Sequence, residues 1–242
     1  MEQAWYRDFS ARCTARSRVP RCLGLQDLDA RWWFLLEDLD AAGFPGRRHG
    51  LSESEREQCL SWLAEFHAAW LGVAPDGLWH TGTYWHLATR PQEWARMAPG
   101  PLKDGAAALD ARLERARYTT LVHGDAKPAN FCFGTASVAA VDFQYVGRGV
   151  GVRDVAYLLG AFGTRELSGR GQAWLDRYFV LLGQALVRHG HGAIADPVEA
   201  EWRGLYPVAW ADFERFMAGW SPGGSRGRYS EALVREALAL PA

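Results

Sequence analysis

The sequence has few cysteines, and none of them follows a metal-binding pattern. Only four occur in 242 residues, and no two are spaced as Cys-x-x-Cys. This argues against a disulfide framework and against a zinc site. Cys59 and Cys132 lie among apolar residues, where a cysteine behaves as a small core side chain. We therefore expect Cys13, Cys22, Cys59 and Cys132 to be reduced thiols.

The chain also lacks a long apolar run and an excess of basic charge. No apolar run approaches the length of a membrane span, and the first eight residues carry acids without the apolar stretch of a signal peptide. The net charge of −1 provides no basic field for a nucleic acid. The length suits one or two domains with a large buried core. We expect a cytoplasmic protein that binds neither membrane nor nucleic acid.

One stretch, residues 121–144, holds polar residues in a pattern typical of catalysis. It predicts a β-branched strand, a tight polar loop, and two short apolar strands, the second ending at Asp142. Asp125, Asn130 and Asp142 would then converge. Mg²⁺ prefers carboxylates and other hard oxygens, and it keeps waters and substrate phosphates as its remaining ligands. Each residue also has a structural alternative: Asp125 and Asn130 as ordinary polar loop residues, Lys127 as a solvated side chain, and Asp142 as the cap of a turn.

The spacing from Asp125 to Asn130 is that of the protein-kinase catalytic loop. His-Gly-Asp stands here where protein kinases have His-Arg-Asp, and Asp-Phe-Gln stands where they have Asp-Phe-Gly. In this combination the sequence resembles the aminoglycoside phosphotransferase, choline kinase and ecdysteroid-kinase-like group of small-molecule kinases. The resemblance implies a protein-kinase-like α+β fold with a mostly helical C-terminal lobe.

The resemblance also implies roles for individual residues. Asp125 would be the catalytic base, and Asn130 and Asp142 would be ligands of Mg²⁺. Lys127 would lie near the γ-phosphate of ATP; it departs from many members of the group but matches the Asp-x-Lys-Pro-x-Asn pattern of protein kinases. Asp154 would support the catalytic loop, although N-capping of the next helix explains it equally well. His123 is expected to be buried and hydrogen-bonded as a second supporting residue.

Upstream of the motif, the pattern predicts part of a small lobe. Trp5 and Phe9 suggest a helix over residues 2–12, and residues 21–25 and 32–36 read as strands around a turn at 26–30. We assign residues 1–38 to a remnant of the N-terminal lobe and residues 39–242 to the helical lobe.

The segment Leu35–Leu39 resembles the hinge of the same group. The backbone near Glu37 and Leu39 would hydrogen-bond the edge of adenine. The alternative is a strand end that runs into a loop.

Several helices follow in the predicted C-terminal lobe. Ser52 and Glu55 form a capping box, and Leu60, Leu63 and His67 follow at helical spacing, with His67 expected as a core histidine. Residues 73–101 read as an irregular aromatic connector in which His80 and His86 lack metal-ligand spacing. Further helices are expected over residues 104–117, 174–188, 197–216 and 229–240, with a flexible loop at 221–228.

Two elements that a nucleotide kinase uses are not found in this sequence. They are the glycine-rich hairpin over the phosphates and the strand Lys that pairs with a helix Glu. Glu2 resembles the helix glutamate of that pair. Charge-assisted hydrogen bonds contribute about 1.5–3 kcal/mol each, so their loss would weaken nucleotide binding roughly a thousandfold. We favour a coding start placed too far downstream, with a natural truncation and a non-catalytic relative as alternatives.

Three functions are compatible with these observations. The first is an ATP- and Mg²⁺-dependent phosphotransferase that acts on a small-molecule hydroxyl. The second is a non-catalytic binding module, and the third is a partner-binding role with an exposed apolar surface. The sequence does not indicate which small molecule accepts the phosphoryl group. Trp85, Trp202 and Trp210, with Asp196, Glu199 and Asp212, could form an amine-binding cage, but tryptophans at helical spacing more often pack in the core.

Overall fold

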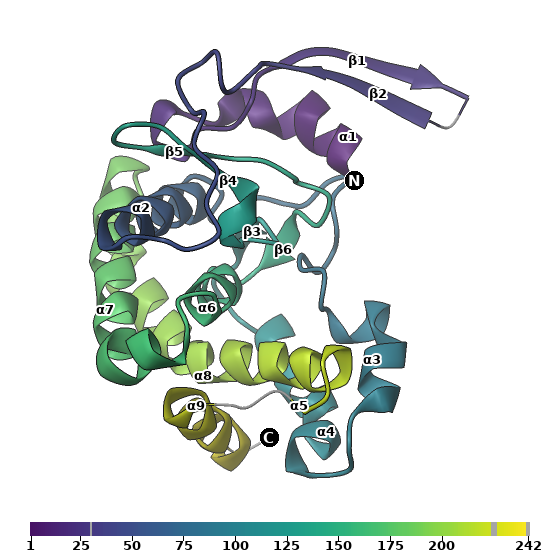
Figure 1. Ribbon diagram of the computed structural model, residues 1–242, viewed down its shortest axis with the longest axis vertical. Helices are drawn as coiled ribbons and strands as arrows, with labels where there is room; N and C mark the ends of the chain where they lie inside the picture. Colours follow the sequence, from purple (N-terminus) through teal and green to yellow (C-terminus); the bar gives the residue numbers. More distant parts are fainter. Residues whose placement is uncertain (30, 224–226, 241–242) are drawn as a thin grey trace.

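The chain folds as an α+β protein in which helices predominate (Figure 1). The computed structural model describes residues 1–29, 31–223 and 227–240. The α-helices are α1 (Glu2–Ala4), α2 (Glu53–Ala69), α3 (Pro91–Arg96), α4 (Pro101–Asp104), α5 (Ala106–Glu114), α6 (Val152–Gly160), α7 (Thr164–Arg188), α8 (Ala195–Trp220) and α9 (Arg228–Ala239). None of these helices is both long and apolar enough to cross a bilayer.

The strands form three small antiparallel ladders, which pair β1 with β2, β3 with β6 and β4 with β5. Their bounds are β1 (Cys22–Leu28), β2 (Arg31–Leu36), β3 (Thr120–Val122), β4 (Phe131–Phe133), β5 (Val138–Ala140) and β6 (Gly147–Gly149). The four short strands β3–β6 lie between the N-terminal segment and the large helices (Figure 1).

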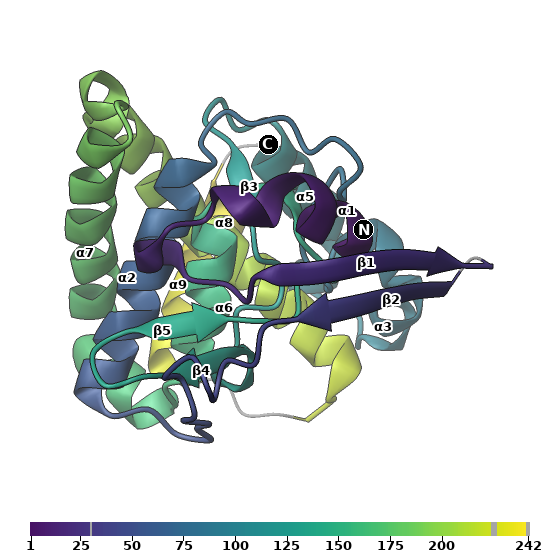
Figure 2. The same ribbon diagram turned by 90° about the horizontal axis from the view of Figure 1, so that it is seen from above.

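The N-terminal segment consists of a helical stretch and a hairpin. Residues 2–12 are helical as predicted, with a π-helical turn over Trp5–Phe9, and both Trp5 and Phe9 are buried. The turn predicted at 26–30 is shorter, because β1 continues through Leu28; Ala30 itself lies outside the described residues. The β1–β2 hairpin projects beyond the rest of the molecule (Figure 2).

The two faces of this hairpin differ in their surroundings. Phe34 packs edge-on against Tyr6, with ring centroids 5.7 Å apart. On the other face, Trp33 and Leu35 are exposed by 66% and 64%. Two large apolar side chains are therefore exposed on this face of the hairpin.

The helix predicted after Ser52 is confirmed as α2. Ser52 Oγ accepts from the Glu55 N–H, and the Glu55 carboxylate accepts from the Ser52 N–H, so the capping box is complete. The helix packs along α7 (Figure 1) and carries Trp62 and Phe66 into the core.

We expect Ser52→Ala to destabilise the protein without affecting its fold. Loss of an N-cap side chain costs about 1 kcal/mol, because helix N–H groups lose their acceptor. Urea unfolding followed by circular dichroism measures the change. Ser61→Ala, an exposed position within α2, is the control and should change stability little. An equal loss in both variants would contradict a role for the cap.

The other predicted helices are present, with different ends, whereas α3 and α4 were not predicted. Helix α7 begins at Thr164, ten residues before the predicted Trp174, and α8 runs from Ala195 to Trp220 with Pro207 inside it. The connector at 73–101 contains the short helix α3, which packs on α8. Of the loop predicted at 221–228, residues 224–226 lie outside the described residues. All four cysteines are free, as predicted.

Candidate active site

The loop after β3 turns sharply at Gly124. Its φ of +81° favours glycine, and a Cβ there would lie 2.3 Å from the Tyr145 carbonyl oxygen. The turn directs the chain from the buried strand β3 into the short 3₁₀ helix Pro128–Asn130 that precedes β4. Asp125 lies directly after the turn.

The Asp125 carboxylate is almost completely buried, with an exposed fraction of 3%. Its Oδ2 accepts from Lys127 Nζ at 2.7 Å and from Asn130 Nδ2 at 2.9 Å. Its Oδ1 is buried and has no hydrogen-bond partner in the described residues. A buried carboxylate oxygen without a donor is uncommon in folded proteins. Asp125 therefore keeps one oxygen to which neither Lys127 nor Asn130 donates, near the Tyr157 hydroxyl, and this oxygen can accept a proton or a hydroxyl group.

Backbone pairing brings Asp142 beside Asn130. The N–H of Val141, the residue before Asp142, donates to the Asn130 carbonyl at 3.0 Å. Asp142 itself has a φ of +68°, a conformation that is unfavourable for a non-glycine residue and that is enriched at functional sites. Because Asn130 uses its amide nitrogen on Asp125, its amide oxygen is available for a cation.

Asp154 is fully buried and holds the backbone of the catalytic loop. Its carboxylate accepts the N–H of His123 at 2.6 Å and that of Gly124 at 2.9 Å. The alternative role as an N-cap is wrong, because Gly151 occupies that position and Asp154 is the third residue of α6. Asp154 thus fixes the loop that carries Asp125.

Two buried histidines complete this network. His67 Nε2 lies 3.1 Å from the Asp154 carboxylate, and its Nδ1 lies 2.8 Å from the Tyr178 hydroxyl, so His67 is a satisfied core histidine as predicted. His123 lies between the Val141 carbonyl, 2.9 Å from its Nε2, and the Asp125 N–H, which donates to its Nδ1 at 3.2 Å. These partners place the His123 proton on Nε2.

Tyr157 is a site residue that the sequence analysis missed. Burial raises the pKa of the Tyr157 hydroxyl, and so do the charge and hydrogen bonding of Tyr84 and then those of Asp125. The phenol therefore stays protonated beside the Asp125 carboxylate. The signal in the sequence was weak, because Tyr157 lies in the apolar pattern of α6.

The segment predicted as a hinge follows directly on β2. The Glu37 N–H donates to the Arg21 carbonyl at 2.9 Å, and the Leu39 carbonyl accepts from the Phe44 N–H at 2.8 Å. The Glu37 carboxylate pairs with Arg18 and Arg21, and the hydrogen bond from Arg18 lowers its pKa. Among the hydrogen bonds of the described residues, the Glu37 carbonyl and the Leu39 N–H remain without a partner.

Glu2 lies at the end of the same site, next to Asp142. Its carboxylate accepts the Phe143 N–H at 3.2 Å. Burial and then the negative charge of Asp142 raise the pKa of Glu2. The first helical turn of the chain therefore contacts the Asp-Phe-Gln segment, although the two are about 140 residues apart in sequence.

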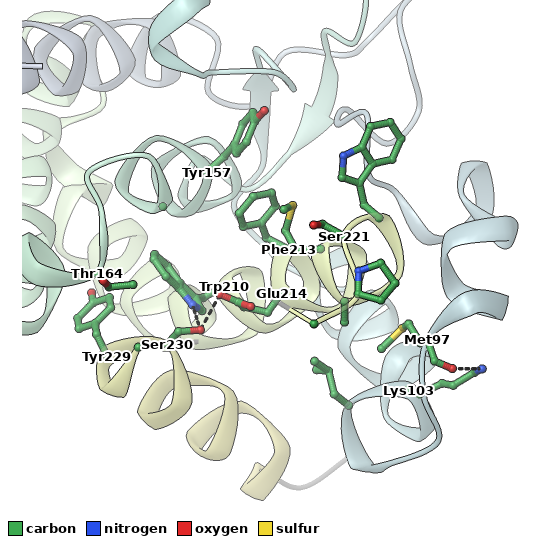
Figure 3. Close-up of a pocket in the computed structure, with 18 of the residues that line it drawn as sticks. Met97, Lys103, Tyr157, Thr164, Trp210, Phe213, Glu214, Ser221, Tyr229 and Ser230 are labelled. Carbon is green, nitrogen blue, oxygen red and sulfur yellow. Dashed lines mark hydrogen bonds between the residues drawn. The ribbon is translucent and has the colours of Figure 1, made fainter. Parts of the chain in front are cut away.

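A large cleft opens beside Lys127 and Tyr157. Its volume is about 880 Å³, and it lies between α6, α8, α9 and the segment that carries Met97 and Lys103 (Figure 3). Lys127 and Tyr157 line the cleft, so it reaches the catalytic loop. A cleft of this size accommodates a small organic molecule.

The proposed amine cage is not formed. Trp85 and Trp202 are fully buried, as the core alternative predicted, and Asp212 is buried against Arg215 at 2.9 Å. Glu199 pairs with Arg203 on α8. Of that set, only Trp210 lines the cleft.

The fold brings His86 together with Asp110 and Glu114, which the sequence spacing did not indicate. His86 lies 3.3 Å from Asp110, while Arg153 and Arg148 lie 3.6 Å and 3.2 Å from Glu114. Two guanidinium groups therefore already balance these carboxylates, and we interpret the cluster as a structural ion-pair network.

Comparisons with known structures place the fold among small-molecule kinases. The amicoumacin kinase hAmiN, solved in complex with AMP-PNP, Ca²⁺ and Ami, aligns with a TM-score of 0.58 at 13% identity, over 98% of this chain and 75% of that one. A choline/ethanolamine kinase family protein from Mesorhizobium loti aligns with a TM-score of 0.51 at 12% identity, over 99% and 84%. A search of curated proteins gave no match.

The architecture is thus that of the protein-kinase-like small-molecule kinases, as the catalytic motif predicted. The model of the phosphotransferase enzyme family, APH, matches residues 1–191, which include every residue discussed above for the catalytic loop and the hinge. The chain belongs to this phosphotransferase family.

Proposed function

We propose that this protein transfers the γ-phosphoryl group of ATP to a hydroxyl group of a small molecule. The observation that carries the proposal is the state of Asp125. It is buried next to Lys127 and Tyr157, which line the cleft; one carboxylate oxygen accepts from Lys127 and Asn130, and the other accepts from neither of them. Membership of a phosphotransferase family supports the same reaction class.

In this mechanism the free oxygen of Asp125 receives the acceptor hydroxyl. Asp125 orients that hydroxyl and takes its proton as the oxygen attacks the γ-phosphorus, while the bond to the bridging oxygen breaks and ADP leaves. Lys127 is 40% exposed at its side chain, so its ammonium can shift from Asp125 toward a bound phosphate. Asp154 and His123 keep the loop fixed during transfer, which limits the reorganisation that the reaction requires.

Asn130 and Asp142 would hold the divalent ion. Both supply hard oxygen atoms and no nitrogen or sulfur ligand, which suits Mg²⁺ with phosphate and water as further ligands. Such an ion neutralises negative charge on the transferring group. The relative hAmiN was solved with AMP-PNP and Ca²⁺, which is compatible with nucleotide and metal at this place.

The nucleotide base would bind at the hinge. The Glu37 carbonyl and the Leu39 N–H offer one acceptor and one donor to the edge of adenine. Residues 1–38 would then form the smaller lobe above the nucleotide and residues 39–242 the larger one. A cytoplasmic location, where ATP and Mg²⁺ are abundant, is part of this proposal.

A binding module without transfer is the second candidate. It is favoured by the surroundings of Glu2, which accepts the Phe143 N–H and lies near Asp142 but has no lysine partner. The two lysines of the chain are bonded elsewhere, Lys127 to Asp125 and Lys103 to backbone carbonyls. Without a lysine paired with Glu2 to contact the phosphates, this chain would bind ATP weakly and transfer phosphoryl groups slowly.

Replacement of Asp142 separates the two candidates. We expect Asp142→Asn to raise the Mg²⁺ concentration for half-maximal phosphoryl transfer roughly tenfold or more, because a charged ligand is lost. The assay is ADP release with a panel of small alcohols, titrated with Mg²⁺. Asp196→Asn, an exposed position on α8, is the control. Binding of small alcohols without any turnover in the unmodified chain would favour the binding module.

A further inference from the structure

The cleft described above has a lining that restricts the chemistry of the acceptor. Most of its side chains are apolar, and they come from elements far apart in the sequence. The large apolar members include Met97, Leu102, Leu167, Trp210, Phe213, Met217 and Trp220. Figure 3 shows Phe213 and Trp210 on α8 facing the same space as Tyr157 and Met97. A ligand in this cleft would therefore contact mainly apolar and aromatic surface.

The charged side chains of the cleft lining, and Ser230, are hydrogen-bonded within the protein. Lys103 Nζ donates to the carbonyls of Ala95 at 3.0 Å and of Met97 at 2.8 Å. Ser230 Oγ donates to Glu214 at 2.6 Å and accepts from Trp210 Nε1 at 3.0 Å (Figure 3). A polar ligand would have to compete with these hydrogen bonds.

The carboxylates at the cleft are already bonded within the protein. Among the described lining residues, the ionised side chains are Lys103, Lys127 and Glu214. Glu214 accepts from Ser230, and Asp125, which lies beyond the lining, accepts from Lys127 and Asn130. A ligand with several ammonium groups would have to compete for these carboxylates and would also meet two lysines. Burying its charges without partners is costly.

We infer that the acceptor is an alcohol on a largely apolar ring system, neutral or negatively charged, and not a polycationic amino sugar. The inference rests on the proposed function, since it assigns the acceptor of that reaction. The cleft volume of about 880 Å³ suits a molecule with several fused rings. The hydroxyl of such a molecule would reach Asp125 past Tyr157 and Lys127, while its apolar body lies between α8 and α3–α4.

Two hydroxylated probes of similar size distinguish the acceptor classes. Cholate has an apolar ring system and one negative charge, whereas kanamycin is a polyhydroxylated polycation. We expect cholate, below its micellar concentration, to bind at least tenfold more tightly than kanamycin in calorimetric titrations without nucleotide. Tighter binding of kanamycin, or binding of neither probe, would overturn the inference.

A pair of exposed tryptophans provides the site-specific test. Trp220 lines the cleft and is 57% exposed, and Trp33 is 66% exposed on the distant hairpin. We expect Trp220→Ala to weaken cholate binding about five- to tenfold through lost apolar contact, and Trp33→Ala to leave it unchanged. Equal effects of the two substitutions would overturn the assignment of cholate to the cleft.

These outcomes are independent of the phosphoryl-transfer step. Cholate binding that depends on Trp220, without any turnover of ATP, would uphold the acceptor class and count against the proposed function. Phosphorylation of kanamycin would uphold the proposed function and overturn the acceptor class.

Discussion

Asp125→Asn is expected to reduce phosphoryl transfer by roughly 10²–10⁴-fold, which is the usual contribution of a general base. The substitution keeps the volume of the side chain and its hydrogen-bonding ability toward Asn130, but an amide cannot take the proton of the acceptor hydroxyl. The rate of ADP release at saturating Mg²⁺ and ATP measures the effect. The thermal midpoint should change little, because the loop remains tied to Asp154.

The interpretation of that variant needs a control for surface charge. Asp76→Asn removes a carboxylate from an exposed position away from the cleft and should keep full activity. Unchanged turnover in Asp125→Asn would remove this residue from the base role. Loss of both turnover and folded structure would show instead that the substitution acts through stability.

The catalytic loop was predictable from sequence because its signals are local. Asp125, Lys127 and Asn130 lie within six residues, and backbone geometry alone brings them together once the glycine turn forms. The capping box at Ser52 is equally local, since its two hydrogen bonds join residues three apart. Such patterns depend little on the rest of the chain.

The parts that sequence analysis missed depend on contacts between distant residues. His67 and Tyr178 contact each other across 111 positions, and nothing in either neighbourhood indicates the other. Tyr157 follows an ordinary helical pattern, and only the packing of α6 against α8 turns it toward the cleft. The amine cage was wrong for the same reason, because helical spacing does not say which face of α8 is buried.

Asp154→Ala is expected to lower the free energy of unfolding by about 3–5 kcal/mol, which is typical when one partner of a buried charged network is removed. The change leaves the N–H groups of His123 and Gly124 and the Nε2 of His67 buried without an acceptor. Each unsatisfied group costs about 1–3 kcal/mol, and partial entry of water reduces the sum. Urea unfolding measures the loss.

Asp154→Asn is the matched variant, because its amide oxygen can still accept one of the backbone hydrogen bonds. We expect it to lose about half as much stability and to retain some activity, whereas the alanine variant should lose transfer even when folded at low temperature. A loss below about 1 kcal/mol in the alanine variant would mean that water replaces the carboxylate. The loop would then owe its position to the glycine turn and to the ring of His123, and Asp154 would no longer explain how Asp125 is held in place.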